Sequence, residues 1–372
     1  MGLQADKSFS DDLIAWQKTH GRHALPWQNT TDAYKIWLSE IMLQQTQVAA
    51  VIPYYLKFLQ SFPTVEALAA ASSEEVMVYW SGLGYYTRAR NLHRCATQVV
   101  ASYGGVFPND PALLAELPGI GRSTAAAIAA FAYGVRAAIL DGNVKRVFAR
   151  VFGIDTFPGE RKTEQHLWQL AESLLPRVGI QSYTQGLMDL GATLCIRSRP
   201  ACERCPLAHR CVALASGRVA ELPIRKPKKA TPEKHAVMLV VVDRHQVLLT
   251  RRPEHGIWGG LLSLPELEGF TLVAHGAITS GANSAMATLI QQLIAPFGEL
   301  ADYEKLQSFS HGFTHFKLHV VPYRVWLTQR RTAIGQTSHG WVDIDQLHTA
   351  ALPAPVRKLL QELLRTDDLF AA

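Results

Sequence analysis

Four cysteines stand close together in the middle of the chain. Their thiols are separated by six, two and five residues and can close around one metal centre: Cys195, Cys202, Cys205 and Cys211. Structural zinc sites usually combine two tight cysteine pairs held apart by a longer loop. The compact, uneven spacing therefore favours an iron–sulfur cluster, with zinc as the alternative. Four arginines and a single glutamate in the same loop predict a positively charged surface.

Two acidic residues have surroundings that suit acid and electrostatic catalysis. Glu40 is flanked by Ile36, Trp37 and Ile41, and such apolar neighbours disfavour its charged form and raise its pKa. Asp141 stands just before a helical pattern. A carboxyl that stays protonated can donate a proton, and one that ionises can offset positive charge. The alternatives are an exposed helix glutamate for Glu40 and a helix cap for Asp141.

A glycine-rich turn precedes Asp141. The sequence LPGIG, residues 117–121, separates two helical runs, and its backbone N–H groups at a helix amino terminus suit a DNA phosphate. Alone, the turn would equally fit a plain connection between two helices. Its combination with Asp141, twenty residues after Gly121, is far less common.

Periodicity divides the chain into two domains. Apolar residues recur at helical spacing in the first half, which predicts an all-α domain over 1–216. Residues 217–234 are rich in proline and lysine and are expected to form an exposed basic linker. Short β-rich runs follow, with helices expected over Ala285–Ile294 and Val356–Leu364. Residues 235–372 are therefore predicted to form a smaller α+β domain.

The composition is that of a soluble globular protein. Hydrophobic residues make up 48% and charged residues 18%, and the formal net charge of +6 fits a polyanionic partner. No apolar run approaches the roughly 20 residues that span a bilayer, and the amino terminus carries no secretory signal. We therefore expect no membrane association and a cytoplasmic location, where clustered cysteines bind metal more readily than they form disulfides.

Five segments together resemble the bacterial adenine-specific mismatch DNA glycosylase (MutY) family. They are WLSEIMLQQT, WSGLGYYTRARNL, LPGIGRSTA, LDGNVKRV and the four-cysteine loop. The resemblance implies an all-α helix-hairpin-helix glycosylase fold in which the four cysteines hold one [4Fe–4S] cluster. It also implies the partner, double-stranded DNA with adenine mispaired with 8-oxoguanine or guanine.

The resemblance assigns the two carboxyl groups to the removal of adenine. Glu40 would protonate adenine N7 as the general acid, and Asp141, supported by Asn143, would stabilise the oxocarbenium-like sugar. Physical reasoning agrees, because adenine is a poor leaving group until it is protonated and an ionised carboxylate offsets positive charge at C1′. The base must first be flipped out of the duplex.

Further residues match three groups of DNA contacts in that family. The wedge that fills the gap left by the flipped base matches Gln45, Leu83 and Tyr85. The DNA-binding positions of the hairpin match Leu117, Gly119, Gly121 and Ser123. The adenine pocket matches Trp27, Leu43 and Met188, with Gln185 near the sugar. For the aromatic and apolar members, a place in the helical core is the alternative.

The carboxy-terminal part, including GIWGGLLSLPELEG, resembles the MutT/Nudix-like domain of the same family. A nucleotide hydrolase of that class needs a metal-binding helix rich in glutamate, whereas the matching stretch GANSAMATLIQQLI contains no acidic residue. The domain is therefore predicted to recognise 8-oxoguanine and not to hydrolyse nucleotides. The recognition loop matches HGFTHF, at Phe313, Thr314 and His315, and the triplet Phe309, Ser310 and His311 is the alternative register.

The resemblance predicts a monomeric, monofunctional glycosylase of base excision repair, associated with the bacterial nucleoid. The first alternative is a pyrimidine-lesion glycosylase and lyase of the same fold, which carries a lysine where this chain has Ser123. A non-enzymatic iron–sulfur DNA-binding protein would not need Glu40 and Asp141 together. A nucleotide hydrolase is disfavoured by the missing acidic helix, and the sequence identifies no protein partner.

Because the cysteine spacing favours a cluster over zinc, purified protein is expected to contain iron and sulfide and to absorb broadly in the visible region. Metal analysis and the absorption spectrum measure this. Cys202→Ser should lower DNA affinity or solubility before it alters the chemical step. Stoichiometric zinc without iron would contradict the prediction.

Overall fold

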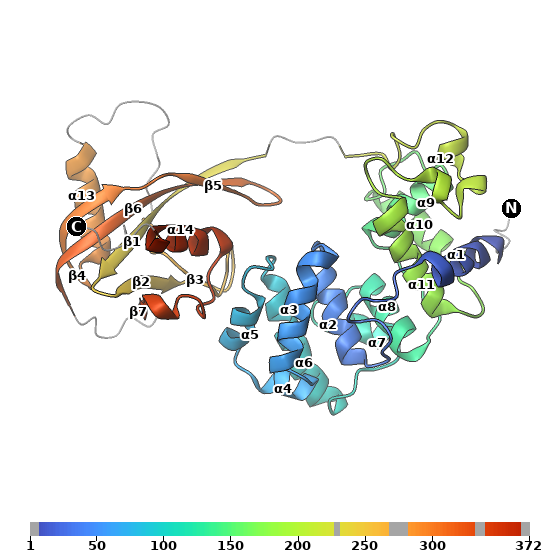
Figure 1. Cartoon of the computed structure of the whole chain (residues 1–372), viewed down its shortest axis with the longest axis horizontal. Helices are drawn as coiled ribbons and strands as arrows, with labels where there is room; N and C mark the ends of the chain where they lie inside the picture. Colours follow the sequence, from blue (N-terminus) through green and yellow to red (C-terminus); the bar gives the residue numbers. More distant parts are fainter. Residues whose placement is uncertain (1–6, 227–230, 268–281, 332–338, 366–372) are drawn as a thin grey trace. The chain divides into compact units, whose positions relative to one another are not determined.

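The computed structural model describes residues 7–226, 231–267, 282–331 and 339–365. The chain divides into two compact units (Figure 1). One comprises Met1–Ser72 and Arg88–Lys228, and the other Ser73–Thr87 and Lys229–Ala372. A helical first unit and a second unit built on a sheet confirm the predicted fold class. The domain boundaries expected at residues 216 and 234 stay predictions.

The first unit consists of short helices joined by tight turns. They are α1 (Lys7–His20), α2 (Ala33–Leu43), α3 (Val48–Ser61), α4 (Val65–Ala70), α6 (Thr87–Tyr103), α7 (Pro111–Ala115), α8 (Arg122–Tyr133), α9 (Gly142–Val151), α10 (Arg161–Ser173), α11 (Ile180–Asp189) and α12 (Val212–Ala215). Side-chain caps fix where several begin: Asp32 accepts from the N–H of Tyr34 at α2, and Asp110 from that of Ala112 at α7. Helix α5 (Ser73–Trp80) belongs to the second unit.

A hydrophobic core joins α1, α8, α9 and α11 (Figure 1). Phe9 of α1 packs edge-on against Phe148 of α9 and Tyr183 of α11, with ring centroids 6.0 and 6.4 Å apart. The buried residues of α8 are mostly alanines, whose small side chains let neighbouring helices approach closely. This packing holds α9 in place, and Asp141 caps its amino terminus.

The second unit contains a mixed seven-stranded sheet within the described residues. Its strands are β1 (Glu233–Asp243), β2 (Gln246–Arg251), β3 (Leu262–Ser263), β4 (Gly298–Lys305), β5 (Phe309–Gly312), β6 (Lys317–Arg330) and β7 (His339–Asp343). Their order is β3-β2-β1-β6-β4, with β5 paired to β6 and β7 paired to β2. Strands β1 and β6 run parallel, and the other pairs are antiparallel.

Strand β1 and helix α13 (Ala282–Ile294) form much of the core of this unit. Seven successive residues of β1, 236–242, are buried, as expected for a strand covered on both faces. Val237, Leu239 and Val241 pack together with Ile290 of α13. Helices α13 and α14 (Ala354–Arg365) confirm the two helices predicted in this domain, and each begins slightly earlier than predicted.

The expectation of an exposed linker over residues 217–234 is wrong at both ends. Leu222 is buried, and Nε of Arg150 donates to its carbonyl at 2.9 Å. At the other end, Glu233 and Lys234 already belong to β1. Arg150 provides the physical reason, because a carbonyl bound to a buried arginine cannot stay in a free segment. Residues 227–230 lie outside the described part of the chain.

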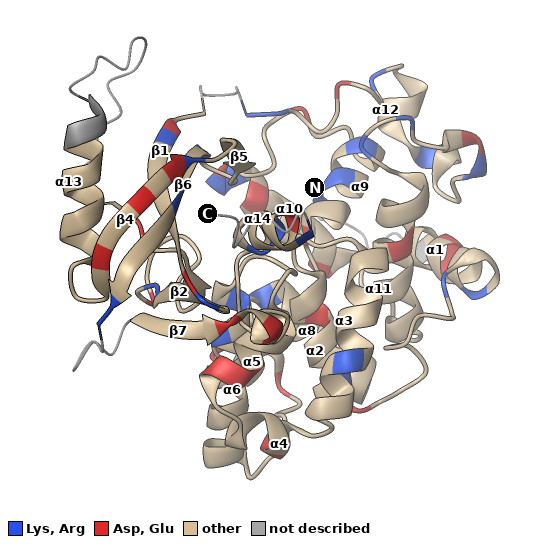
Figure 2. Cartoon of the chain, turned by 60° about the vertical axis from the view of Figure 1, so that its left-hand side comes forward, with Lys and Arg blue, Asp and Glu red and all other residues tan. Residues whose placement is uncertain are grey.

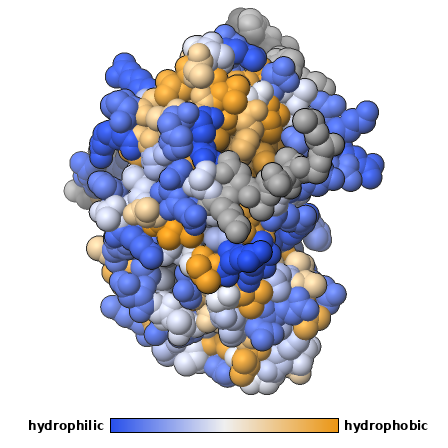
Figure 3. Space-filling model, turned by 90° about the vertical axis from the view of Figure 1, so that its right-hand side faces the viewer, coloured by the Kyte–Doolittle hydropathy of each residue, from blue (hydrophilic) through white to orange (hydrophobic). Residues whose placement is uncertain are grey.

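No described helix is both long and apolar enough to cross a membrane. On the face drawn in Figure 3, hydrophobic side chains gather in patches between hydrophilic ones. Single exposed apolar residues such as Val178 and Val212 are ordinary on a protein surface.

Candidate active site

A cavity of about 540 Å³ lies in the first unit, beside α2. The segment between α1 and α2 bounds it together with α2 and α11. Five residues that the sequence singled out line it: Trp27, Glu40, Leu43, Gln185 and Met188. The structure thus brings the residues matched to the adenine pocket around the same space as the expected general acid.

Glu40 faces this cavity from a helix that is otherwise almost wholly buried. Its neighbours Ser39 and Ile41 are buried, so protein surrounds the carboxyl on the sides away from the cavity. Burial raises the pKa of Glu40 from 4.5 to about 8, and the charge of Asp141 adds to the shift. At neutral pH the carboxyl is therefore protonated, as a general acid requires.

Asp141 caps α9. Its Oδ1 accepts the N–H of Val144 at 2.8 Å. Burial raises the pKa of Asp141, whereas the N–H groups of Val144 and Asn143 and the charge of Arg146 lower it. Asp141 is therefore the helix cap that the sequence offered as the alternative. The charge of the same carboxyl also raises the pKa of Glu40. The two roles are compatible, because a carboxylate accepts several hydrogen bonds.

Arg146, one turn along α9, connects Asn143 to the cysteine loop. Its Nη2 donates to Oδ1 of Asn143 and to the carbonyl of Gly191, both at 2.8 Å. Its Nε donates to the carbonyl of Cys195 at 2.8 Å. A Cβ on Gly191 would lie 2.5 Å from Cβ of Asn143, so only glycine fits there. Gly191 belongs to a π-helical turn after α11, an irregularity frequent at functional sites.

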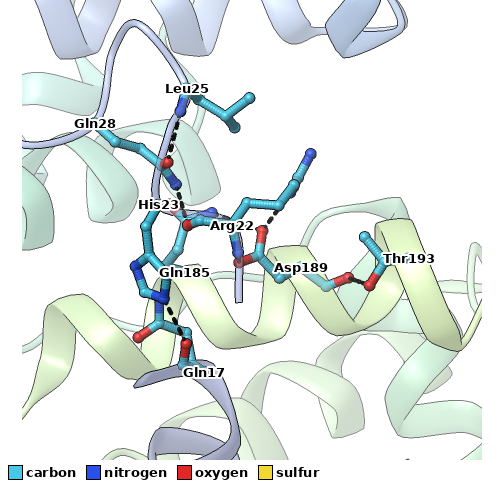
Figure 4. Close-up of polar contacts among 8 residues, drawn as sticks. All are labelled: Gln17, Arg22, His23, Leu25, Gln28, Gln185, Asp189 and Thr193. Atoms are coloured by element: carbon cyan, nitrogen blue, oxygen red, sulfur yellow. Dashed lines mark hydrogen bonds and ion pairs between the residues drawn. The ribbon is translucent and has the colours of Figure 1, made fainter. Parts of the chain in front are cut away.

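A buried ion pair fixes one wall of the cavity (Figure 4). Asp189 is 0% exposed and accepts from Nε of Arg22 at 2.7 Å and from its backbone N–H at 2.8 Å. The amide of Gln185 donates to the same carboxylate at 2.8 Å. Because an ionised carboxylate only accepts hydrogen bonds, the amide nitrogen must face Asp189. The amide oxygen of Gln185 has no hydrogen-bond partner in the part of the chain described, and it is the end left for a ligand.

Gln28 braces the segment that carries Trp27 (Figure 4). Its Oε1 accepts the N–H of Leu25 at 3.0 Å, and its Nε2 donates to the carbonyl of Arg22 at 2.9 Å. The indole of Trp27 packs edge-on against Tyr55, with ring centroids 5.3 Å apart. These contacts hold a flat aromatic surface at the cavity before any ligand binds.

The expected wedge residues include two strained backbone positions. Gln45 and Tyr85 have positive φ values of 58° and 51°, which is uncommon for residues other than glycine and concentrates at functional sites. Both side chains are exposed, whereas that of Leu83 is buried. Arg88 fixes the turn that holds Gln45, because its Nη1 donates to three carbonyls at the end of α2, at 2.7 to 2.9 Å.

The glycine-rich turn leads into α8 as the sequence predicted. Gly119 has a φ of 81°, and a Cβ there would lie 2.8 Å from Cβ of Asn91, so the position requires glycine. Gly121 is exposed at the N-cap of α8. Leu117 is 2% exposed, so its side chain anchors the turn in the core and does not reach toward DNA.

Ser123 supports the loop before Asp141. Its hydroxyl accepts the N–H of Leu140 at 3.0 Å. Lys145, on the first turn of α9, pairs with Glu164 at 2.6 Å. The position expected to carry a nucleophilic amine in a lyase therefore carries a hydroxyl that already has a structural partner.

The four cysteines line one small apolar cavity. One loop therefore brings four sulfur donors to the same place, as the ligands of a single metal centre require. Such a donor set fits an iron–sulfur cluster, and zinc is the alternative.

In the second unit, the expected recognition residues form the tip of the β5–β6 hairpin. The N–H of Phe313 donates to the carbonyl of Phe316 at 2.8 Å, and the turn leaves Thr314 and His315 exposed. The hydroxyl of Thr314 has no hydrogen-bond partner among the residues described. In the alternative register, the hydroxyl of Ser310 is already paired, at 2.8 Å, with a histidine of β6. The geometry favours the later register.

Trp258 packs behind this hairpin. Its ring centroid lies 5.6 Å from that of Phe313 and 5.9 Å from that of His311. Trp258 is 6% exposed and has a positive φ of 55°. Arg252 lies over its ring at 5.9 Å and pairs with Glu266 at 2.8 Å. The hairpin is thereby connected to the sheet through a chain of side chains.

Sequence reasoning missed five residues that hold these sites: Arg22, Arg88, Arg146, Asp189 and Trp258. Their partners lie far away along the chain or are backbone carbonyls, which no motif records. One signal was available, because Asp189 interrupts the apolar pattern of GLMDLGATL, and a charged residue in such a pattern is rarely buried unless it is paired.

The chain is similar to known proteins along nearly its whole length. A model of HhH-GPD superfamily base excision DNA repair proteins matches residues 38–173, and a NUDIX domain model matches residues 236–362. An adenine DNA glycosylase of Buchnera aphidicola subsp. Schizaphis graminum is 34% identical over 95% of this chain and 98% of its own length. The adenine DNA glycosylase of Homo sapiens is 32% identical over 95% of this chain and 73% of its own. A solved structure of a thermostable thymine-DNA glycosylase is 31% identical with a TM-score of 0.52, over 56% of this chain and 96% of that one.

The helical fold, the hairpin and these matches define a DNA glycosylase of the helix-hairpin-helix superfamily, an enzyme of base excision repair that binds DNA. Similarity across both units then defines the narrower group. The chain belongs to the adenine DNA glycosylase family, and its second unit is a Nudix-type domain. This confirms the family, the enzyme class and the two-part architecture predicted from the sequence.

The raised pKa of Glu40 should make the stability of the protein depend on pH. In the unfolded chain this carboxyl titrates near 4.5, and in the folded chain near 8. Between these values unfolding releases a proton, so the free energy of unfolding falls as pH rises, by at most about 1.4 kcal/mol per pH unit from this group. Glu40→Gln cannot titrate and should gain stability relative to the unchanged protein between about pH 5 and 8.

Chemical denaturation across this pH range measures the effect. Glu116→Gln, at an exposed position, is the matched control and should follow the unchanged protein. Identical pH dependence for Glu40→Gln and the unchanged protein would show that Glu40 ionises normally.

Proposed function

We propose that this chain hydrolyses the N-glycosidic bond of adenine mispaired with 8-oxoguanine or guanine and leaves the DNA strand intact. One observation carries the proposal: Glu40, with a pKa raised to about 8, lines a cavity beside Trp27 and feels the charge of Asp141. Two carboxyl groups in different environments are what glycosidic hydrolysis uses.

The reaction follows from these positions. The flipped adenine lies against Trp27, and Glu40 donates its proton to N7 of the ring. The C1′–N9 bond then breaks, its electron pair goes to the protonated base, and positive charge develops on the sugar. Asp141 stabilises that charge from the amino terminus of α9, with Asn143 beside it. Water adds to C1′, and its proton is taken up by a carboxylate of the site, which completes the hydrolysis.

Gln185 was expected near the sugar, but we propose that it contacts the base and provides the selectivity for adenine. Asp189 binds the amide nitrogen of Gln185 at 2.8 Å, so the amide oxygen is the group that meets the base. An acceptor there suits the exocyclic amino group of adenine, whereas the corresponding oxygen of guanine would meet a second acceptor. Leaving buried polar groups unpaired in this way is strongly unfavourable.

The DNA is held on either side of the flipped nucleotide. The N–H groups of the turn at Gly119 and Gly121 bind a phosphate at the start of α8. Gln45 of the first unit, which is exposed, inserts beside the orphan base, and Tyr85 of the second unit is exposed as well. Their strained backbone is the feature that supports this role.

The cysteine loop holds a [4Fe–4S] cluster bound by Cys195, Cys202, Cys205 and Cys211. When bound, the cluster supplies a rigid, anionic centre for the loop, and hydrolysis itself requires no electron transfer. Arg150 contacts Sγ of Cys195 at 3.3 Å, so a cation already faces one ligand. Arg146 and Arg150 both bind the loop from α9, the helix that Asp141 caps.

The second unit recognises the oxidised guanine opposite the adenine. Thr314 and His315 are exposed at the hairpin tip, and the threonine hydroxyl is available to a base. Helix α13 contains no acidic residue, so the metal site of a nucleotide hydrolase is missing there. One chain carries both proposed contacts, which supports action as a monomer, on DNA of the bacterial nucleoid.

Cleavage of pyrimidine lesions with a lyase step is the second candidate. Similarity of the first unit to a thymine-DNA glycosylase favours it. A lyase needs an amine at C1′, yet Ser123 holds the matching position and Lys145 is paired with Glu164. That structure also has no counterpart for the Nudix-type unit, which the adenine DNA glycosylases match. We therefore favour adenine.

Glu40→Gln and Asp141→Asn should bind DNA containing 8-oxoguanine:adenine nearly as the unchanged protein does, yet lose excision. General acid catalysis contributes about 10²–10⁴-fold, and charge stabilisation in a dry site a comparable factor. Single-turnover excision and duplex binding measure the two steps separately. Glu362→Gln, at an exposed position of α14, should leave both unchanged.

Losses of less than about tenfold are incompatible with these roles. Borohydride should trap little covalent adduct, and the product should be an intact abasic strand. Efficient trapping by the unchanged protein would establish the lyase instead.

Trp258 should act as a positioning residue for the recognition of the opposite base. Trp258→Leu removes the ring behind Phe313 and should reduce the preference for 8-oxoguanine:adenine over guanine:adenine severalfold. Trp258→Phe should restore most of it. Trp341→Leu, which removes another stacked tryptophan of the same unit, is the matched control and should leave the preference intact. An equal loss on both substrates in Trp258→Leu would indicate a purely structural role.

A further inference from the structure

A second cavity, of about 450 Å³, lies in the first unit away from the adenine pocket. Four segments form it: α9 from its first turn to Arg150, residues 157–159 before α10, the cysteine loop at Arg197, and residues among 220–226 after α12. The last of these segments was expected to be free linker. It is held in place because Leu222 is buried and its carbonyl accepts from Nε of Arg150 at 2.9 Å.

Six cations and no acidic residue line this cavity. They are Lys145, Arg146, Arg150, Arg197, Arg225 and Lys226. Figure 2 shows basic residues on α9 and along the segment between α12 and β1. Carbonyls of the cysteine loop accept hydrogen bonds from the guanidinium groups of Arg146 and Arg150. Lys145 forms an ion pair with Glu164.

The remaining three cations have no ion-pair partner among the described residues: Arg197, Arg225 and Lys226. All three side chains are exposed, so they can turn toward a ligand while the internal ion pairs of the protein stay in place. A cavity lined by several cations without counter-charges attracts an anion, and a ligand with more than one negative oxygen satisfies them together.

The position of the cavity beside the first turn of α9 indicates which kind of anion it binds. Gly142 and Lys145 belong to the first turn of α9 and line the cavity, while Asp141 caps the same turn. One helical turn rises only about 5.4 Å, so a DNA strand that brings its sugar to Asp141 passes the cavity. On this basis, which rests on the proposed role of Asp141, we propose that the cavity binds a phosphodiester of the bound DNA, with Arg225 and Lys226 as the ligands from the linker.

The salt dependence of DNA binding tests this. Removal of one cation that neutralises a phosphate should reduce the slope of log affinity against log salt by about 0.9. The double variant Arg225→Gln with Lys226→Gln, in the full chain, should therefore lower the slope for an undamaged duplex by about 1 or more between about 50 and 200 mM salt. Arg218→Gln is the matched control, because Arg218 lies on the same segment, pairs with Glu221 at 2.9 Å and does not line the cavity.

An unchanged slope in the double variant would overturn the proposal, and so would an equal reduction in Arg218→Gln, which would reflect general charge. Because an undamaged duplex undergoes no excision, the slope is read independently of catalysis. Failure of Asp141→Asn to lose excision would remove the proposed catalytic role without altering this slope.

Lysine acetylation of the unchanged protein provides a test that needs no variant. Duplex DNA should slow modification of Lys226, and should do so more strongly than millimolar inorganic pyrophosphate at matched ionic strength. Protection by pyrophosphate without protection by DNA would show a site for a free anion and would overturn the assignment to the DNA backbone.

Discussion

The electrostatic coupling between two neighbouring carboxyl groups, those of Glu40 and Asp141, is the condition on which the rest of this site depends. Two like-charged groups within electrostatic reach resist ionising together, and Glu40 carries the proton because buried helix α2 gives its carboxyl little solvation. Burial raises the pKa of Asp141 as well, but the N–H groups of Val144 and Asn143 and the charge of Arg146 oppose that rise. The two carboxyl groups are thus set apart by the elements on which they stand.

Helix α9 connects most of the functional parts of the first unit. Its amino terminus is capped by Asp141, and its side chains Arg146 and Arg150 bind carbonyls of the cysteine loop. Arg150 also binds the carbonyl of Leu222 and fixes the segment after α12. The opposite face of α9 packs in the core through Phe148. A shift of this helix would therefore move the carboxyl group of Asp141, the cysteine loop and the basic cavity together.

Much of the fold and part of the candidate site could be predicted from sequence because their signals are local. Helical spacing, the buried run of β1 and the two helices of the second unit depend on neighbouring residues. The glycine requirement at Gly119 and the capping by Asp141 are also encoded within a few residues. Motif matching grouped Trp27, Glu40 and residues of α11 correctly around one cavity. It failed for the linker, whose composition gave no sign of the arginine that binds it.

The sequence by itself determined which residues can do chemistry: a carboxyl among apolar neighbours, a second at a helix start, and four thiols in one loop. Only the tertiary structure decided how they are held. The pairing of Asp189 with Arg22, which orients Gln185, joins residues far apart along the chain. The contacts of Arg88 and Trp258 and the gathering of cations around the linker have the same origin. Such contacts depend on which segments are brought together by packing. A buried charge or ring then contacts the carbonyl or side chain that lies beside it in the folded chain.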